Sequence, residues 1–498
     1  MPVIPTPVNL FQTYQDLHQF LLNCQHTLTD KMQAQIISIS LEILPVDPLT
    51  VLREICEPHQ LHFYLEKQTI PEANIHKNNL AIAAIDSATH FTATSGNRFS
   101  QAQYFIQSCL DSTISLGTTH LPFSGPHFFC SFTFFEKDCQ ANINSFHQNG
   151  HHQQKLSINP HFPPATIFLP RWQITQKNHH NILVINTVIS TAINIENISQ
   201  TIWQKFQQIT QINYTPLSNL TNPHKKLRKI NVNHLQEFKK SVASALDLIN
   251  SNSLEKIVLA HAIDIYSQTP FNLINSLNNL RFIYPDCYVF STSNGNGQNF
   301  IGASPERLIS IHNNQLVTDA LAGSAPRSKT PSQDAKLANN LLCSEKDLRE
   351  HQFVIDFIVK RLHDLGLKPN YSSQPHLLQL SNIQHLWTPI TAEISQNIHL
   401  LEILAELHPT PAVAGVPRDI AQQQIHNFET FDRSVYAAPI GWIDYLGNGE
   451  FAVGIRSALI DGDRARLYAG AGIVAGSEPD KELAEVQLKL QTLLKALV

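Results

Sequence analysis

Short turns rich in glycine and asparagine divide the second half of this 498-residue chain, and they restrict its fold more than any other feature. An Asn-Gly-Asn-Gly turn at 294–297 joins an apolar run at 287–292 to another that begins at Phe300. Turns at 447–449 and 461–462 separate three further runs, around 442–444, 451–456 and 466–468. Such turns connect neighbouring strands of opposite direction. We therefore predict antiparallel hairpins, with the last three runs forming a meander.

Helical periodicity occurs in separate blocks between the strand-like runs. Apolar residues at spacings of three and four predict a helix near 235–249 after the capping residue Asn233. A second helix is predicted after a capping box at 477–480, and it is expected to bury Leu483, Val486, Leu490, Leu493 and Leu497. The runs 128–135, 182–189 and 256–265 are typical of buried strands. This grouping favours an α+β fold over a doubly wound one.

A proline-containing segment near 215–223 indicates a boundary within the chain. It divides an amino-terminal, strand-rich part at 1–225 from a carboxy-terminal part at 226–498. The first part contains a polar loop at 148–155 and no recognisable chemical motif. We expect both parts to belong to one structural domain.

The charge composition restricts the possible partners. The chain carries 35 Lys and Arg residues against 40 Asp and Glu, a net charge of -5, and so lacks the basic surface of a nucleic-acid-binding protein. No apolar stretch approaches the roughly 18 residues of a membrane span, and residues 1–7 lack the pattern of a signal peptide. The scattered cysteines contain no Cys-x-x-Cys pair, which is typical of a reducing cytoplasm. We expect a cytoplasmic protein.

Two helical segments each place a pair of carboxylates three residues apart on one face. Asp347 and Glu350 form one pair, and Glu482 and Glu485 form the other. Two such pairs could meet at one Mg²⁺ ion, which prefers oxygen ligands and keeps some of its water. Each pair taken alone is also consistent with an acidic surface, and Asp347 with a role at the start of its helix.

A glycine-rich segment at 468–476 lies between a predicted strand and the last predicted helix. It lacks the spacing and the strand-helix-strand context of a dinucleotide-binding loop. Gly470 and Gly472 would let an anion approach the backbone near a helix N-terminus. Arg456, in the apolar run at 451–456, could bind a carboxylate with its forked guanidinium, or serve the structure alone.

Two single residues are candidates for proton transfer. Lys256 opens the predicted strand at 256–265 beside Ile257 and Val258, and burial among apolar neighbours favours the neutral amine that acts as a general base. Glu306, which follows a Gly-Ala-Ser-Pro segment at 302–305, is a candidate general acid. The simpler alternative for a lysine in a strand is that its side chain extends to solvent.

The order of these features along the chain identifies a family. Segments at 256–260, 301–308, 321–324, 344–351, 408–415 and 468–473 together resemble the chorismate-utilising enzymes. The resemblance covers roughly residues 230–498. It implies one large α+β domain, with antiparallel sheets in a layered sandwich flanked by helices. The amino-terminal part would pack as an additional layer.

The resemblance also implies roles for individual residues. Lys256 would deprotonate a water that attacks C2 of chorismate, and Glu306 would protonate the departing C4 hydroxyl. Glu350 and Glu485 would bind Mg²⁺, with Asp347 and Glu482 nearby and bonded through water. Substrate contacts would come from Tyr436, Arg456, Gly470, Gly472, Lys489 and His385.

The nucleophile distinguishes the branches of this family. Members that use ammonia usually have Gln where Lys256 stands, and one type has a nucleophilic Lys where this chain has Ala322. No glutaminase module is present, so water is the expected nucleophile and the expected activity is a Mg²⁺-dependent isomerase that forms isochorismate. Alternatives are salicylate synthesis and a non-catalytic binding protein. The Glu306–Arg307 pair and the segment 408–411 resemble the menaquinone and phylloquinone type, and a monomer without a glutaminase subunit is expected.

Overall fold

Helices and strands alternate in blocks along the chain, as their periodicity predicts. The computed structural model describes residues 3–4, 12–28, 34–68, 79–94, 96–136, 160–212, 227–231, 235–394 and 398–497. The helices are α1 (Tyr14–His26), α2 (Pro48–Ile55), α3 (Arg98–Asp111), α5 (Ile195–Thr210), α6 (Leu235–Asn250), α7 (Leu273–Ile283), α8 (Pro331–Leu342), α9 (Glu345–Asp364), α10 (Leu400–Leu407), α11 (Arg418–Phe428) and α12 (Pro479–Leu497).

Strands form the centre of the molecule. In the first half they are β1 (Val3–Ile4), β2 (Gln35–Glu42), β3 (His62–Lys67), β4 (Leu80–Ala93), β5 (Thr113–Gly117), β6 (His127–Phe132), β7 (Ala165–Lys177) and β8 (His180–Ile189). In the second half they are β9 (Arg228–Asn231), β10 (Lys256–Tyr266), β11 (Tyr288–Ser293), β12 (Gln298–Ser304), β13 (Arg307–His312), β14 (Gln315–Pro326), β15 (Asn370–Tyr371), β16 (His376–Gln379), β17 (Ile383–Glu393), β18 (Gly415–Val416), β19 (Pro439–Asp444), β20 (Gly449–Val453), β21 (Ser457–Asp461) and β22 (Arg464–Val474).

One series of paired strands runs across the whole molecule. Its order is β1, β5, β2, β8, β7, β4, β3, β11, β12, β21, β22 and β10. The pairings of β5 with β1 and β2 are parallel, and the others in the series are antiparallel. Strand β10, the last in this series, also pairs with the short strands β9 and β18.

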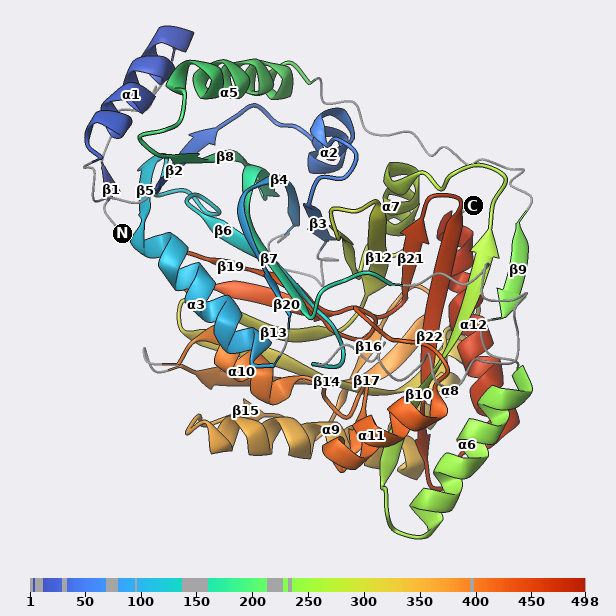
Figure 1. Ribbon diagram of the computed structural model, residues 1–498. Helices are drawn as coiled ribbons and strands as arrows, with labels where there is room; N and C mark the ends of the chain where they lie inside the picture. The colour runs from blue at the N-terminus through green and yellow to red at the C-terminus, as the bar shows by residue number, and fades with distance from the viewer. Residues whose placement is uncertain are drawn as a thin grey trace.

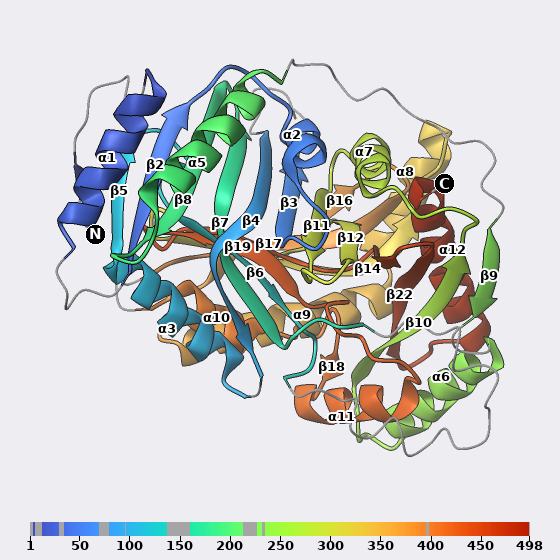
Figure 2. The same cartoon turned by 45° about the horizontal axis from the view of Figure 1, so that its top comes forward.

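A second series branches from β7. It continues through β6, β19, β20, β13, β14 and β17, and each of these pairings is antiparallel. Helices α1 and α5 lie on the outer side of β2 and β8, whereas α9, α10 and α11 lie on the opposite side of the molecule (Figures 1 and 2). The predicted α+β sandwich with antiparallel sheets and flanking helices is therefore confirmed.

The two halves of the chain share both series of strands. Strand β3 pairs with β11 through Phe63 and Thr292, and β6 pairs with β19 through Phe129 and Trp442. The rings of Phe63 and Phe129 are fully buried, with their centroids 4.9 Å apart. Because the sheets and the core cross from one half to the other, the chain forms one layered domain.

The turn chemistry predicts the hairpins better than it predicts the meander. Strands β11 and β12 form the expected hairpin around the 294–297 turn, and the last helix buries its predicted apolar residues. The turns at 447–449 and 461–462 do join antiparallel strands, β19 with β20 and β21 with β22. The continuous three-stranded meander is wrong, because the run at 451–456 is not one strand. Strand β20 ends at Val453 and pairs with β13, whereas β21 pairs with β12 and β22. Arg456 lies in the link between them, with a φ of 49°.

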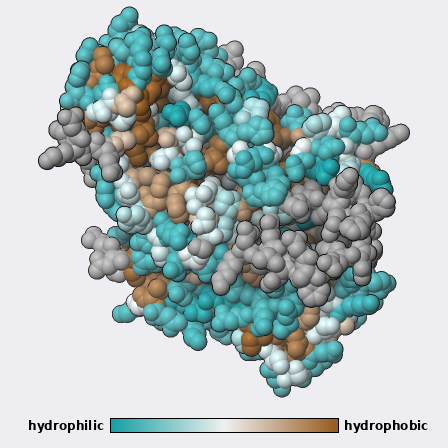
Figure 3. Space-filling model, viewed as in Figure 1, coloured by the Kyte–Doolittle hydropathy of each residue, from teal (hydrophilic) through white to brown (hydrophobic). Residues whose placement is uncertain are grey.

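Three further predictions lie outside the described residues. These are the polar loop at 148–155, the boundary at 215–223 and the capping residue Asn233. None of the helices in the described part of the chain combines the length and apolar composition needed to cross a membrane. On the face seen in Figure 3, hydrophobic residues gather toward α1 and α5, and hydrophilic residues cover much of the rest that is coloured.

Candidate active site

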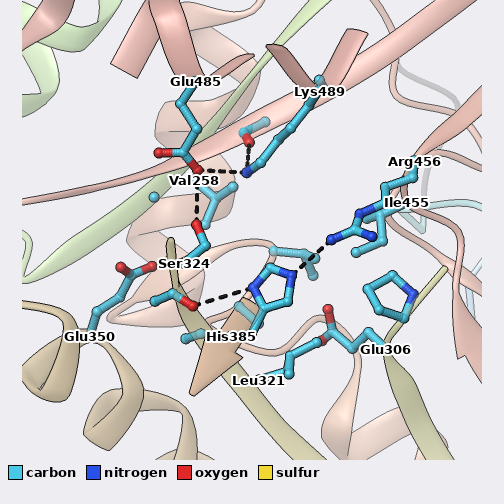
Figure 4. A pocket seen from close by; sticks show the side chains of 18 of the residues that line it. Val258, Glu306, Leu321, Ser324, Glu350, His385, Ile455, Arg456, Glu485 and Lys489 are labelled. Carbon is cyan, nitrogen blue, oxygen red and sulfur yellow. Dashed lines mark hydrogen bonds and ion pairs between the residues drawn. The ribbon is translucent and has the colours of Figure 1, made fainter. Parts of the chain in front are cut away.

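A cavity of about 150 Å³ lies where β10, β14 and β22 meet the amino-terminal turns of α9 and α12. Every site residue predicted from the sequence lines this cavity except Lys256. The lining includes Glu306, Asp347, Glu350, His385, Tyr436, Arg456, Gly470, Gly472, Glu482, Glu485 and Lys489. Figure 4 shows how several of these side chains converge from different strands and helices. Among the described residues, none that precedes Val258 lines it.

Lys256 lies directly behind the cavity wall. It begins β10, its side chain is 0% exposed, and its Nζ atom lies 2.9 Å from Oε1 of Glu350, which does line the cavity. The alternative in which the side chain of Lys256 extends to solvent is therefore wrong. The Nζ atom makes no hydrogen bond of regular geometry with the described residues, so it retains capacity to bond a small polar molecule.

Glu306 lies at the break between β12 and β13. Its backbone N–H donates to Oγ of Ser304 at 3.2 Å, and its carbonyl accepts from the N–H of Val453 at 3.1 Å. The residue is buried, and burial raises the pKa of its carboxyl to about 8, although the charges of Lys256 and Arg456 act in the opposite direction. The carboxyl is therefore mostly protonated at neutral pH, as a general acid must be.

Four carboxylates from two helices face the cavity. Asp347 and Glu350 project from the first turns of α9, and Glu482 and Glu485 from those of α12. The N–H of Asp347 donates to Oγ of Ser344, which caps α9. This confirms that the segment starts a helix, as the local sequence predicts.

Lysines pair with three of these carboxylates. Besides the Lys256–Glu350 pair, Lys346 contacts Glu482 at 3.2 Å and Lys489 contacts Glu485 at 2.8 Å. Within the described residues, no three His, Cys, Asp or Glu side chains lie close enough together to hold a metal ion as they stand.

The chemistry of the carboxylate set nevertheless fits a divalent cation. Burial, together with the charges of Glu350 and Glu485, raises the pKa of Asp347. Burial and the charge of Glu485 likewise raise the pKa of Glu482. Burial alone would raise the pKa of Glu485, but Lys489 holds it below its usual range. The negative charges thus act on one another across one cavity, and oxygen-only donors suit Mg²⁺.

Arg456 and His385 form a second polar group on the opposite wall (Figure 4). Nη2 of Arg456 lies 2.8 Å from Nε2 of His385, and Nδ1 of His385 lies 3.3 Å from the carbonyl of Gly323. Burial, followed by the charges of Arg456 and Lys489, holds the pKa of His385 well below its usual range. The neutral ring therefore accepts from Arg456 through Nε2 and donates to Gly323 through Nδ1, which fixes the direction of the guanidinium.

The glycines of the 468–476 segment lie inside a strand. Gly470 and Gly472 lie opposite Ala260 and Val258 of β10, so the segment is a strand and not a loop, and both residues line the cavity. Their importance is steric: a Cβ at Gly472 would collide with the carboxylate of Glu350. A Cβ at Gly470 would lie 3.0 Å from Oη of Tyr436. The absence of a side chain at Gly470 and Gly472 therefore leaves space in the cavity.

Ser324 and Lys346 are polar lining residues that the sequence did not single out, and Tyr468 is a third. Oγ of Ser324 donates to Oε1 of Glu485 at 3.3 Å, and Lys346 pairs with Glu482. Both lie within motifs that indicate the family, at 321–324 and 344–351, which was the available signal. A more apolar cavity of about 320 Å³ adjoins the first, and Ser324, Arg456, Glu485 and Lys489 line both.

Comparison with known proteins assigns this arrangement to a family. A family model described as a chorismate binding enzyme matches residues 19–498. The chain belongs to the chorismate-binding enzymes. The match extends well into the amino-terminal half, for which the sequence motifs gave no assignment.

Individual relatives in this family are isochorismate synthases by name. The chain is 37% identical over 261 residues to isochorismate synthase MenF of Bacillus subtilis, covering 52% of this chain and 55% of that protein. It is 39% identical over 264 residues to the salicylate biosynthesis isochorismate synthase of Pseudomonas aeruginosa, covering 53% of this chain and 55% of that protein. The chain thus spans little more than half the length of these two relatives.

A solved member of the family extends the likeness to the whole chain. The menaquinone-specific isochorismate synthase MenF from Escherichia coli has a TM-score of 0.72 and 25% identity, covering 97% of this chain and 100% of that chain. DhbC from Bacillus anthracis, with a TM-score of 0.66 and 24% identity over 90% of this chain and 99% of that chain, has the same fold. The amino-terminal half is therefore part of the family fold.

Proposed function

We propose that the protein is an isochorismate synthase, which converts chorismate to isochorismate by adding water at C2 and removing the C4 hydroxyl. The observation that carries this proposal is the pairing of two proton-transfer groups around one cavity. Glu306 is buried and mostly protonated at neutral pH, whereas Lys256 lies behind a carboxylate that lines the same cavity. The names of the relatives support the same activity.

Lys256 would act as the base that takes a proton from water as the new C2–O bond forms. The ring double bonds shift, the C4–O bond breaks, and the departing hydroxyl takes the proton of the Glu306 carboxyl. Water supplies the oxygen that is added, and a second water leaves. The sum is an isomerisation without an oxidant or a second substrate.

The four carboxylates would hold a magnesium ion. Glu350 and Glu485 are the proposed direct ligands, and Asp347 and Glu482 would bind it through water. When bound, Mg²⁺ neutralises the ring carboxylate of chorismate and fixes its position. The lysines that pair with these carboxylates keep them separated and oriented toward the cavity.

The opposite wall would bind the enolpyruvyl carboxylate. Arg456, oriented by His385, offers a forked pair of donors, and Tyr436 contributes a hydroxyl beside Gly470. Gly472 leaves room beside Glu350, and Lys489 donates to the carbonyl of Gly470 at 2.9 Å. The two carboxylates of the substrate would therefore be fixed at opposite ends of the cavity.

Water is the proposed nucleophile, so we propose no glutaminase subunit and a monomeric enzyme. The full-length likeness to a menaquinone-specific enzyme supports a role in menaquinone or phylloquinone synthesis. Salicylate formation requires that pyruvate be eliminated from bound isochorismate, and it is the alternative that product analysis must distinguish.

Chromatography of the products from purified protein, chorismate and Mg²⁺ tests the proposal. We expect isochorismate, and we expect its formation to stop when a chelator removes the metal and to return when Mg²⁺ is restored. Salicylate with pyruvate would assign the enzyme to the alternative activity. Absence of turnover under every metal condition would contradict an enzymatic function.

A further inference from the structure

A buried ion pair follows directly after the proposed acid. Arg307, the residue next to Glu306, donates through Nη2 to Oδ1 of Asp319 at 2.9 Å. The same oxygen accepts from Nε1 of Trp387 at 3.0 Å. The side chains of Arg307 and Asp319 are only 20% and 10% exposed. Three strands, β13, β14 and β17, thus meet at one carboxylate.

The local backbone gives this ion pair a specific task. The register between β13 and β20 shifts between Arg307 and Ile309, directly after Glu306. A bulge at this point interrupts the ladder directly after Arg307, although the carbonyl of Glu306 still accepts from the N–H of Val453 in β20. The side-chain bond of Arg307 to Asp319 of β14 therefore adds a second constraint at a point where the backbone ladder is irregular.

A second set of polar contacts lies near the Arg307–Asp319 pair. Oη of Tyr288 donates to Oε1 of Glu450 at 2.5 Å and accepts from Nζ of Lys67 at 2.5 Å. Burial lowers the pKa of Arg307, but the charges of Asp319 and Glu450 outweigh that effect and keep it above its usual range. Lys67 belongs to β3, so the amino-terminal half reaches the surroundings of the proposed acid.

We propose that Asp319, acting through Arg307, is a positioning residue that holds the Glu306 carboxyl in place as the proton donor. The proposal rests on the proposed function, because it needs Glu306 to be the acid. It adds that an ion pair outside the cavity sets both the direction of the carboxyl and its electrostatic surroundings.

Several charged groups face this region and enter any pH dependence. Lys256 of β10 and Arg456 of the β20–β21 link lower the pKa of Glu306, whereas Asp319 of β14 raises it. The others near the pair are Arg307 of β13, Glu450 of β20, Tyr288 of β11 and Lys67 of β3. Asp319 is the anion whose removal changes Glu306 in a known direction.

Asp319→Asn tests the proposal. We expect kcat to fall on the order of tenfold while KM for chorismate changes by less than about twofold, because a misplaced acid slows chemistry rather than binding. We also expect the high-pH limb of the kcat/KM profile to move to lower pH, since loss of the anion lowers the pKa of Glu306. Asp319→Glu should restore the position of this limb.

Asp334→Asn is the matched control. It removes a similar Arg–Asp pair, in which Arg327 contacts Asp334 at 2.9 Å with side-chain exposures of 27% and 14%. Asp319 is among the charges that act on Glu306 and Asp334 is not, so in Asp334→Asn kcat and the pH profile should remain those of the wild type. If Asp319→Asn lowers kcat without moving the limb, or leaves both unchanged, the positioning role is wrong.

Arg307→Lys provides a second variant if Asp319→Asn is not obtained folded. It keeps both charges but loses the planar fork, so kcat should fall by about threefold with the high-pH limb unmoved. An unchanged kcat would overturn the proposal. A wild-type protein that forms no isochorismate would instead contradict the proposed function, so the two failures are distinguishable.

Discussion

The two halves of the chain build the same sheets but contribute differently to the cavity. Strands β3 and β6 of the first half pair with β11 and β19 of the second. Yet the described residues that line the cavity lie between Val258 and Lys489. The first half thus supplies scaffold, and the second supplies both scaffold and site. A substitution in each half should therefore separate stability from activity.

Lys256→Ala in the second half should have the largest effect. Loss of the proposed base is expected to lower kcat about 10³-fold, because general bases typically contribute between about 10² and 10⁴. Steady-state kinetics and chorismate binding by calorimetry would measure the change, with binding retained. Lys205→Ala removes an ion-paired lysine of the first half, 3.6 Å from Glu57, and should leave kcat unchanged. Equal losses in both variants would break the contrast between the halves.

Phe129→Ala in the first half should affect stability instead. Phe129 is fully buried, with its ring centroid 5.8 Å from that of Phe168, and truncating a buried Phe typically costs about 3–5 kcal/mol. Denaturant unfolding would measure this loss, and kcat per folded molecule should equal that of the wild type. Tyr104→Ala, at a residue that is 78% exposed, should change stability by less than about 0.5 kcal/mol. A fall in kcat of folded Phe129→Ala would show that the scaffold and the site are not separable.

The pH dependence of stability should show the smallest effect. The pKa of Glu306 is about 8 in the folded protein against 4.5 ordinarily, so the folded state binds the extra proton and stability falls as the pH rises from 4.5 to 8. Glu306→Gln cannot lose a proton, and it should remove up to about 4 kcal/mol of this decline between pH 5 and 9. Unfolding by urea at both pH values would detect the difference. In the control Glu57→Gln, which changes an exposed carboxylate, the free energy of unfolding should decline with pH as it does in the wild type. The same decline in Glu306→Gln would contradict the raised pKa of Glu306.

The sequence predicted those features of the fold that depend on neighbouring residues. The β11–β12 hairpin followed from its turn, and α12 followed from its capping box and apolar spacing. The meander did not, because β20 and β21 do not pair with each other. Each pairs with its hairpin neighbour, β19 or β22, and with a distant strand, β13 or β12. Strand pairing across such separations depends on the whole core, which no local pattern contains.

The site shows the same division between local and global information. The motifs identified which residue types surround the cavity, including the carboxylates of α9 and α12. They could not show that Lys256 is fully buried or that Glu306 is mostly protonated at neutral pH, because both depend on packing. The left-handed backbone of Arg456 was likewise hidden, since a positive φ is uncommon for such a residue.

The pairing of β6 with β19 also has a consequence during protein synthesis. Phe129 and Trp442 are partners in this ladder although 313 positions (442 − 129) separate them. At about 5–20 residues per second, a ribosome needs about 16–60 s to make the intervening chain. Throughout that interval one edge of β6 lacks its partner, and an unpaired apolar edge favours aggregation. The edge of β6 therefore stays open to wrong pairing until β19 has been made.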